Sequence, residues 1–275
     1  MENATLPQSK RVKVIFFSLM LGLLLLRFPF IISLVYGIIP IPKEIGTYIF
    51  YGGTYLMAAI MIFLKRDSLA DYNIGLASLV IFMISPFVQL PCQYFAMETI
   101  QPDLWVRLAA SVGLFMALLI TRPKLRKRSF KELLLWLIVA IVVGIGIGVL
   151  TGTISSLQTI TRSPEHPSAL LVINLFFIQL GNAAAMEEPL FRGFLWGFLK
   201  QLHWKDCWIW LFQAALFWLG HIYYLGVANM SFWIIVPLGA LILGLVVWRS
   251  KSIGTSMIVH GLFNSISDIV AHFTW

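Results

Sequence analysis

The chain consists largely of hydrophobic stretches that are long enough to cross a lipid bilayer. A helix needs about 20 apolar residues to span the hydrocarbon layer, and only helices or closed barrels satisfy their backbone there. Nine such stretches occur, at 12–39, 45–64, 74–96, 104–121, 132–157, 168–199, 207–224, 231–248 and 253–272. The first stretch is interrupted by Arg27 and Pro29. The sixth stretch is too long for one straight crossing, and we interpret 187–199 as an offset continuation of it. Eight full crossings are therefore an alternative to nine. We predict an all-α polytopic integral membrane protein with eight to nine transmembrane helices in one bundle.

The composition excludes several other classes of protein. Hydrophobic residues make up 59% of the chain and charged residues only 12%, whereas a soluble domain carries about 25% charged residues. A soluble enzyme, a disordered tail, a disulfide scaffold and a nucleic-acid-binding domain are therefore not expected. Cys92 and Cys207 match no metal or disulfide spacing. The expected partners are membrane lipids, and nucleic acid is not among them.

The net charge of +8 comes from basic residues that gather in alternate loops, at 10–13, 65–66, 122–131, 200–205 and 249–251. Basic loops face the cytoplasm in most membrane proteins. We therefore expect a cytoplasmic N-terminus, in a bacterial cytoplasmic (inner) membrane. The loop at 122–131 is the most basic one, and it divides the chain into an N-terminal four-helix transmembrane region, 1–130, and a second transmembrane domain, 131–275.

Two local patterns predict how the fifth stretch begins and packs. Ser129 precedes Glu132 by three residues and an apolar run follows, which is a capping-box pattern and places a helix start there. Gly144, Gly148 and Gly152 are four residues apart, so they share one helix face and allow a second helix to approach closely.

Ionisable residues within apolar stretches are costly and are therefore candidates for function. Glu187 and Glu188 are adjacent, and Arg192 follows Glu188 by four residues, the spacing of a helical ion pair. Glu187 is turned about 100° away around the helix and stays without that partner. An unpaired carboxylate in a poorly solvated site is suited to act as a general base. A structural ion pair is the alternative interpretation of Glu188 and Arg192.

Three further polar residues fall at corresponding depths. His221 ends the seventh stretch, and His260 and Asn264 lie four residues apart in the ninth, on one helix face. Counted from the basic loop between their stretches, Glu187 and His221 both lie about 25 Å into the membrane. The same count places His260 and Asn264 about 14–20 Å deep. We therefore expect all four to share one polar cavity, which opens on the extracytoplasmic side.

These residues resemble the three motifs of the CAAX protease and bacteriocin-processing family (CPBP, or Abi) of intramembrane proteases. The motifs are Glu187-Glu188-x-x-x-Arg192, Phe217-x-x-x-His221 and His260-x-x-x-Asn264, in this order, and the resemblance covers about 170–270. Residues 131–275 would then form a CPBP/Abi-type catalytic transmembrane domain, while 1–130 show no comparable signature.

The resemblance implies a glutamate-dependent endopeptidase without a cofactor. Glu187 and His221 would activate water, His260 and Asn264 would form the oxyanion hole, and Glu188 and Arg192 would hold their helix in place. Zinc bound by Glu187, His221 and His260 is the alternative, because Glu and two His form a possible zinc site. The substrate would be a membrane-anchored protein or peptide that is cleaved near its end.

Other polar residues receive simpler interpretations. We expect Arg27 to extend toward the membrane surface, with a groove for a substrate carboxylate as the alternative. His166, His203 and His272 are expected at the interface with water. Four amide side chains within the apolar stretches are expected to form interhelical hydrogen bonds: Gln89, Asn174, Gln179 and Gln213.

Two other functions compete with the protease. A transporter could use the same polar cluster to bind an ion or to relay protons, but no inverted repeat is visible and Asn264 would have no evident role. A family member that has lost catalysis and serves as a scaffold is the second alternative, and the complete motif set argues against it.

Overall fold

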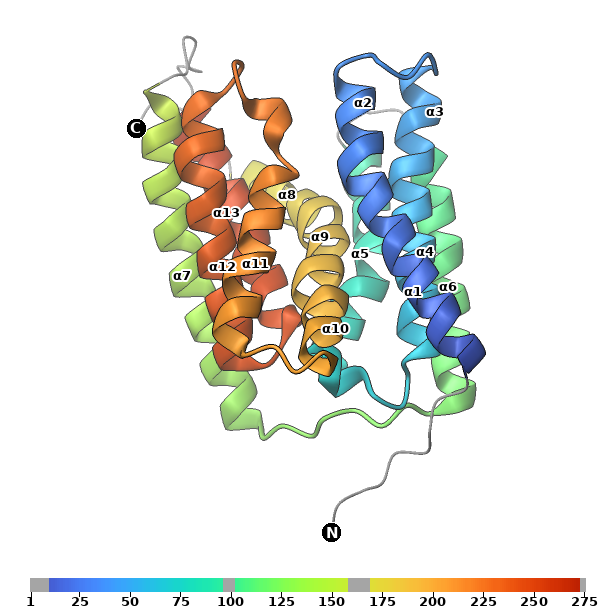
Figure 1. Ribbon diagram of the computed structural model, residues 1–275. Coiled ribbons are helices and arrows are strands. Elements are labelled where there is room, and N and C mark those ends of the chain that lie inside the picture. Colours follow the sequence, from blue (N-terminus) through green and yellow to red (C-terminus); the bar gives the residue numbers. More distant parts are fainter. Residues whose placement is uncertain (1–9, 96–101, 158–168, 273–275) are drawn as a thin grey trace.

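The structure is a computed structural model that describes residues 10–95, 102–157 and 169–272. Every regular element within these ranges is a helix, which confirms the predicted all-α class. The helices stand side by side in one bundle, with short connections at its two ends (Figure 1).

Up to the most basic loop, the chain forms nine helical elements among the described residues. They are α1 (Lys10–Leu25), η1 (Leu26–Phe30), α2 (Ile31–Val35), α3 (Lys43–Thr47), η2 (Tyr48–Gly52), α4 (Gly53–Leu64), η3 (Leu69–Tyr72), α5 (Leu76–Phe95) and α6 (Pro102–Thr121). The elements after that loop are α7 (Phe130–Ser156), α8 (Ala169–Gln179), η4 (Leu180–Ala184), α9 (Ala185–Glu188), η5 (Pro189–Leu195), α10 (Trp196–Gln201), α11 (Asp206–Leu219), η6 (Ile222–Tyr224), η7 (Ser231–Ile235), α12 (Val236–Ser250) and α13 (Ile253–His272).

Each of the nine predicted stretches contains a helix in its described part, and most boundaries agree closely. The largest differences are at the ends of the first and seventh stretches, where helix α2 stops at Val35 and α11 at Leu219. Within the described residues, five helical segments are long and apolar enough to cross a membrane: Lys10–Val35, Lys43–Leu64, Asp103–Thr121, Phe130–Ser156 and Ser231–Ser250. The count of eight to nine crossings stays a prediction.

The sixth stretch is one continuous helical run from α8 to α10, so 187–199 continues the same run, and it contains two π-helical segments, η4 and η5. Pro189 begins η5, and because proline has no backbone N–H it removes one α-helical hydrogen bond. Single π-helical turns often occur at functional sites. Here they lie on either side of α9, which carries Glu187 and Glu188.

One hydrophobic core joins the two parts of the chain. Phe16 of α1 contacts Phe194 of η5 edge to face, with ring centroids 5.8 Å apart. Both rings belong to a buried cluster that also contains Tyr55 of α4 and Met257 of α13. The division at residue 130 stays a prediction, and the core is continuous across it.

Helix α7 packs against α13 through its glycine face, as predicted. A Cβ atom added to Gly144, Gly148 or Gly152 would lie 2.6–2.7 Å from a side chain of α13. The predicted helix start is also confirmed, because the Ser129 hydroxyl accepts a hydrogen bond from the Glu132 backbone N–H at 3.1 Å. This packing fixes α13, the helix that carries His260 and Asn264.

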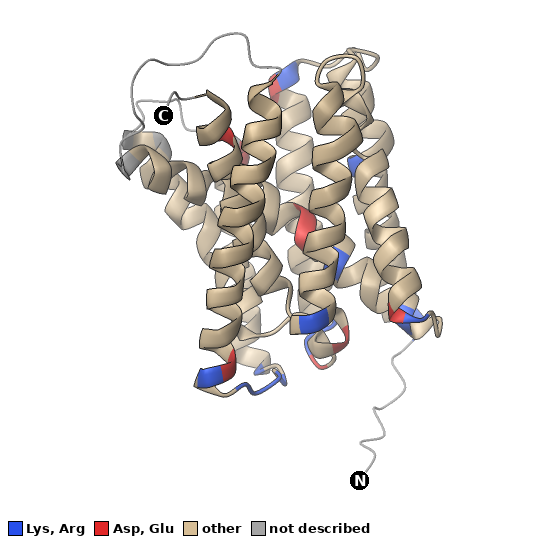
Figure 2. Ribbon diagram, turned by 90° about the vertical axis from the view of Figure 1, so that its left-hand side faces the viewer, with Lys and Arg blue, Asp and Glu red and all other residues tan. Residues whose placement is uncertain are grey.

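The basic loops lie at one end of the bundle. The connections α4–α5, α6–α7, α10–α11 and α12–α13 are all at the lower end in Figure 1, and the blue Lys and Arg segments gather mainly there in Figure 2. The basic residues predicted to lie in alternate loops thus gather at one end of the fold.

Candidate active site

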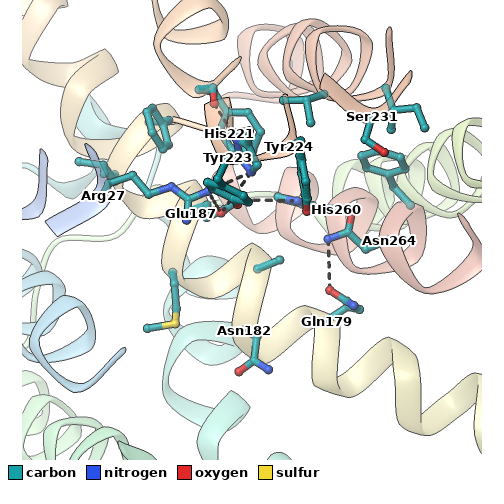
Figure 3. Close-up of a pocket in the computed structure, with 18 of the residues that line it drawn as sticks. Arg27, Gln179, Asn182, Glu187, His221, Tyr223, Tyr224, Ser231, His260 and Asn264 are labelled. Atoms are coloured by element: carbon teal, nitrogen blue, oxygen red, sulfur yellow. Dashed lines mark hydrogen bonds and ion pairs between the residues drawn. The ribbon is translucent and has the colours of Figure 1, made fainter. Parts of the chain in front are cut away.

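The four residues predicted to act in catalysis line one cavity of about 460 Å³. They come from three separate parts of the chain: Glu187 from α9, His221 from the turn after α11, and His260 and Asn264 from α13. Figure 3 shows Glu187, His221 and His260 close together and Asn264 one turn further along α13. The expectation that all four residues share one cavity is therefore confirmed.

Glu187 forms an ion pair with Arg27, which comes from η1. Our preferred interpretation of Arg27, a side chain that extends toward the membrane surface, is wrong, since this residue is only 8% exposed. The expectation that Glu187 lacks a partner is wrong for the same reason. Two imidazole nitrogens lie nearby: His221 Nε2 is 3.9 Å from Glu187 Oε1, and His260 Nε2 is 3.7 Å from Glu187 Oε2.

The hydrogen bonds of His221 define its tautomer. Its Nδ1 lies 2.7 Å from the carbonyl oxygen of Phe217, which can only accept, so Nδ1 carries a proton. Its Nε2 lies 3.0 Å from Nη2 of Arg27, which can only donate, so Nε2 carries none. The neutral ring stacks near Tyr224, with centroids 5.8 Å apart. The lone pair of His221 Nε2 is therefore directed at Arg27, which also contacts Glu187.

Glu188 is fully buried and lies outside the cavity. Its Oε1 is 3.1 Å from Nη1 of Arg192, so the ion pair predicted from the spacing is formed. The Ser256 hydroxyl donates to Oε2 at 2.6 Å, and His260 Nδ1 donates to Oε1 at 2.9 Å. Arg192 also donates to the backbone carbonyl of Ala240 on α12, at 3.4 Å. This second cluster connects α9, η5, α12 and α13.

Asn264 belongs to a short chain of hydrogen bonds along the cavity wall. Its Nδ2 donates to Gln179 Oε1 at 3.2 Å, and Gln179 Nε2 donates to Asp268 Oδ2 at 3.2 Å. The predicted interhelical role of Gln179 is thus confirmed. The Asn264 amide thus donates to Gln179 while the residue itself lines the cavity.

Sequence reasoning missed Ser256 and Asp268, although a signal was present. Ser256, His260, Asn264 and Asp268 follow one another at intervals of four residues, which places them along one face of α13. Extending the motif by one turn in each direction would have found both residues.

A second buried ion pair was also missed. Arg107 lies within the fourth stretch and is 2% exposed, and its Nε is 3.1 Å from Oδ2 of Asp103. Arg107 and Gln89 both donate to Oδ1 of Asn182, each at 3.2 Å, and Asn182 lines the cavity. The sequence contained a signal for this pair, because Arg107 lies inside an apolar stretch and follows Asp103 by four residues.

The remaining candidates lie away from the cavity. His203 is in the exposed turn before α11, and His272 ends α13, while His166 lies outside the described residues. Gln213 donates to the backbone carbonyl of Trp210 within α11, at 2.9 Å, and not to another helix. Asn174 accepts a weak bond from the thiol of Cys92 at 3.7 Å, between α8 and α5.

The zinc alternative requires Glu187, His221 and His260 as ligands. Among the residues that the structure describes, no group of three His, Cys, Asp or Glu side chains has the geometry to hold a metal ion. The Arg27 guanidinium contacts both Glu187 and His221, so a cation already neutralises this donor set. The residues in this arrangement do not fit a zinc ion, and the absence of zinc from the reaction stays a prediction.

The cavity extends toward the end of the bundle opposite the basic loops. Its lining includes Ser155 near the end of α7, Asp268 near the end of α13, and Ser231 at the start of η7. The ends of α7 and α13 and the start of α12 lie in the upper half of Figure 1. The wall is also built by Tyr51 and Thr54, so both parts of the chain enclose the cavity.

Comparison with known families agrees with the motifs. A family model described as type II CAAX prenyl endopeptidase Rce1-like matches residues 167–266, which contain all three motifs. Comparisons with curated proteins and with solved structures gave no match. Residues 167–266 are therefore similar to the Rce1-like type II CAAX prenyl endopeptidases, and the family resemblance that the motifs predicted is confirmed.

Proposed function

We propose that this protein is an intramembrane endopeptidase in which Glu187 and His221 activate a water molecule. The observation that carries the proposal is the convergence of Glu187, His221 and His260 around one cavity inside the helical bundle. The family match over residues 167–266 supports peptide-bond hydrolysis at the level of the family.

The proposed reaction begins with a water molecule between Glu187 and His221. The separation of 3.9 Å between Oε1 and Nε2 allows one water to contact both atoms. Glu187 takes a proton from this water, and the hydroxide forms a bond to the peptide carbonyl carbon. The C–N bond then breaks, and the proton held by Glu187 passes to the leaving nitrogen. The products contain one added OH on carbon and one added H on nitrogen.

His260 and Asn264 are proposed to stabilise the oxyanion that forms during attack. Donors aimed at a developing negative charge contribute about 3–4 kcal/mol each in other hydrolases. Asn264 would donate from its amide, which has two N–H groups and also bonds to Gln179. His260 would donate from Nε2, and the hydrogen bond from its Nδ1 to the Glu188 carboxylate orients the ring.

The proposed substrate is a membrane-anchored protein or peptide that is cleaved near one end. We further propose a bacterial cytoplasmic membrane with a cytoplasmic N-terminus, on the basis of the basic loops, and no cofactor. The cavity would then open on the extracytoplasmic side. Cysteines introduced at 224–228, but not at 202–205, would react with a membrane-impermeant thiol reagent in intact cells.

A comparison of membrane proteomes tests the proposed activity. A deletion strain is complemented with wild type, with Glu187→Gln, or with the control Glu44→Gln, which alters an exposed residue of α3. We expect an uncleaved precursor in the deletion and Glu187→Gln strains and its disappearance in the other two. Identical proteomes in all four strains would instead favour the transporter or the scaffold.

A further inference from the structure

Arg27 contacts both members of the proposed catalytic pair. Its guanidinium forms the ion pair with Glu187, and its Nη2 donates to His221 Nε2 at 3.0 Å. It lies on α1–η1–α2, far outside residues 167–266, which match the endopeptidase family. The match therefore assigns no role to Arg27.

The position of Arg27 follows from the local structure of the first helix. The helix widens into the π-helical segment η1, which contains Pro29. Pro29 removes one backbone donor from the ladder, and the side chain of Arg27 points into the bundle (Figure 3). A buried cation is costly unless it is paired, and Glu187 supplies the opposite charge.

The hydrogen-bond chemistry of Arg27 constrains the protons of its two partners. A guanidinium group donates and cannot accept. Glu187 must therefore be unprotonated at the oxygen that Arg27 contacts, and His221 must be unprotonated at Nε2. These are the two states in which the pair can accept a proton from water and orient it.

We propose that Arg27 is a positioning residue, which holds Glu187 as the carboxylate and His221 as the neutral Nδ1–H tautomer before substrate binds. This inference rests on the proposed peptidase function. When the attacking water enters, it takes over the lone pair of His221 Nε2, and Arg27 keeps its contact with Glu187. The N-terminal part of the chain thereby completes the catalytic site.

Several other ionisable groups surround Glu187 and His221, and they would remain if Arg27 were replaced. These groups are Tyr51 of η2, Arg192 of η5, Tyr223 and Tyr224 of η6, and His260 and Asp268 of α13. Glu188 follows Glu187 on α9 and lies outside the cavity. Arg192 is the other permanent cation in this set, and it is bonded to Glu188. Its charge therefore does not replace that of Arg27 beside Glu187.

The proposal predicts a change in the pH dependence of cleavage. A nearby cation disfavours protonation of a carboxylate and of an imidazole, by about 1–3 pH units. Without Arg27, Glu187 and His221 take up a proton at higher pH. The acidic limb of the kcat/KM profile of Arg27→Met therefore moves to higher pH by about 1–3 units, and raising the pH restores much of the activity.

The experiment measures pH–rate profiles of the purified full-length protein in liposomes. The probe is the precursor that accumulates in the deletion strain or, if none is found, an internally quenched farnesylated peptide. Arg27→Lys keeps the charge and should keep the acidic limb near that of wild type, with a lower plateau. Arg107→Met is the matched control, since it removes another buried arginine and should leave the limb unshifted.

The outcomes separate this inference from the proposed function. If Glu187→Gln retains activity, the proposed function fails. If Glu187→Gln is inactive and Arg27→Met lowers cleavage equally at every pH, only the role of Arg27 is overturned. A rise in activity of Arg27→Met would also overturn it, because Arg27 would then block the water site. If Arg27→Met does not fold, the nitrogen NMR shifts of His221 in the wild type test the proposal instead, because they show which ring nitrogen carries the proton. A proton on Nδ1 alone supports the proposal, and a proton on Nε2 contradicts it.

Discussion

The two neighbouring glutamates of α9 lie in opposite surroundings. The Glu188 side chain is 0% exposed, and its oxygens accept hydrogen bonds from Arg192, Ser256 and His260. The Glu187 side chain is 11% exposed and lines the cavity, with one ion pair and two imidazole nitrogens 3.7–3.9 Å away. The two residues are adjacent in sequence, but the Glu188 carboxylate is enclosed by protein whereas the Glu187 carboxylate borders the cavity.

This difference indicates which carboxylate is suited to chemistry. A buried carboxylate whose lone pairs are filled is stabilised as an anion and has no room for water. Glu188 thus connects helices and orients His260, whereas Glu187 has space for a water molecule and a substrate. Changes at the two positions should therefore have different consequences for activity and for stability.

The largest expected effect is on catalysis, in Glu187→Gln. The amide keeps the size of the side chain but accepts no proton, and loss of a general base costs about 10²–10⁴-fold in rate. The loss of stability should be smaller than in Arg192→Met, because Arg27 lines the cavity, where water can contact its guanidinium, and the glutamine oxygen can still accept a hydrogen bond from it. Turnover of a precursor and melting in detergent measure the two effects, and near-wild-type turnover would remove Glu187 from the mechanism.

Arg192→Met should reduce both stability and activity. It leaves Glu188 buried without its cation, and breaking such a pair costs about 3–5 kcal/mol. Arg66→Met is the control, because its pair with Asp67 is exposed and contributes less than about 1 kcal/mol. Equal melting temperatures of Arg192→Met and wild type would mean that the Glu188 carboxylate does not depend on Arg192 as a buried partner.

A smaller effect is expected where α7 supports α13. In Gly148→Ala the new methyl group would lie 2.7 Å from Ile266 Cβ and 3.1 Å from the Phe263 carbonyl oxygen. Overpacking of this kind costs about 1–3 kcal/mol. Gly146 has no neighbouring atom within 4 Å of an added Cβ, so Gly146→Ala should be neutral or stabilising by up to about 1 kcal/mol. Equal melting of both variants would contradict the close packing.

The smallest expected effect is that of metal removal. Because Arg27 neutralises Glu187, we predict that exhaustive chelation leaves cleavage unchanged and that purified active protein contains no stoichiometric zinc. Activity that is lost on chelation and restored by added zinc would show that Glu187, His221 and His260 rearrange to bind a metal.

Much of the fold was predictable because lipid imposes a strong constraint on sequence. Apolar length alone located the helices, and the glycine spacing identified the face of α7 that meets α13. The spacing of four residues predicted the pair of Glu188 and Arg192, since it depends only on helix geometry. Equal depth below one loop predicted that Glu187 and His221 share a cavity.

The partner of Glu187 was not predictable in the same way. Arg27 reaches this site from a distant part of the chain, 194 residues before His221. Neither the helical period nor the depth of a residue predicts which distant helices are neighbours. The widened turns η1, η4 and η5 also rotate side chains relative to an ideal helix. For these reasons Arg27 was placed toward the membrane surface, and the hydrogen bond from Asn264 to Gln179 was not foreseen.

The most direct test of the account is cleavage by purified protein in liposomes, followed by mass spectrometry of the products. We predict that wild type cuts the precursor at one peptide bond in water labelled with oxygen-18, and that the new carboxyl terminus carries the label. Glu187→Gln, shown to be folded by a cooperative melting transition, should yield no product above background. Cleavage by Glu187→Gln at the wild-type rate would contradict the central claim.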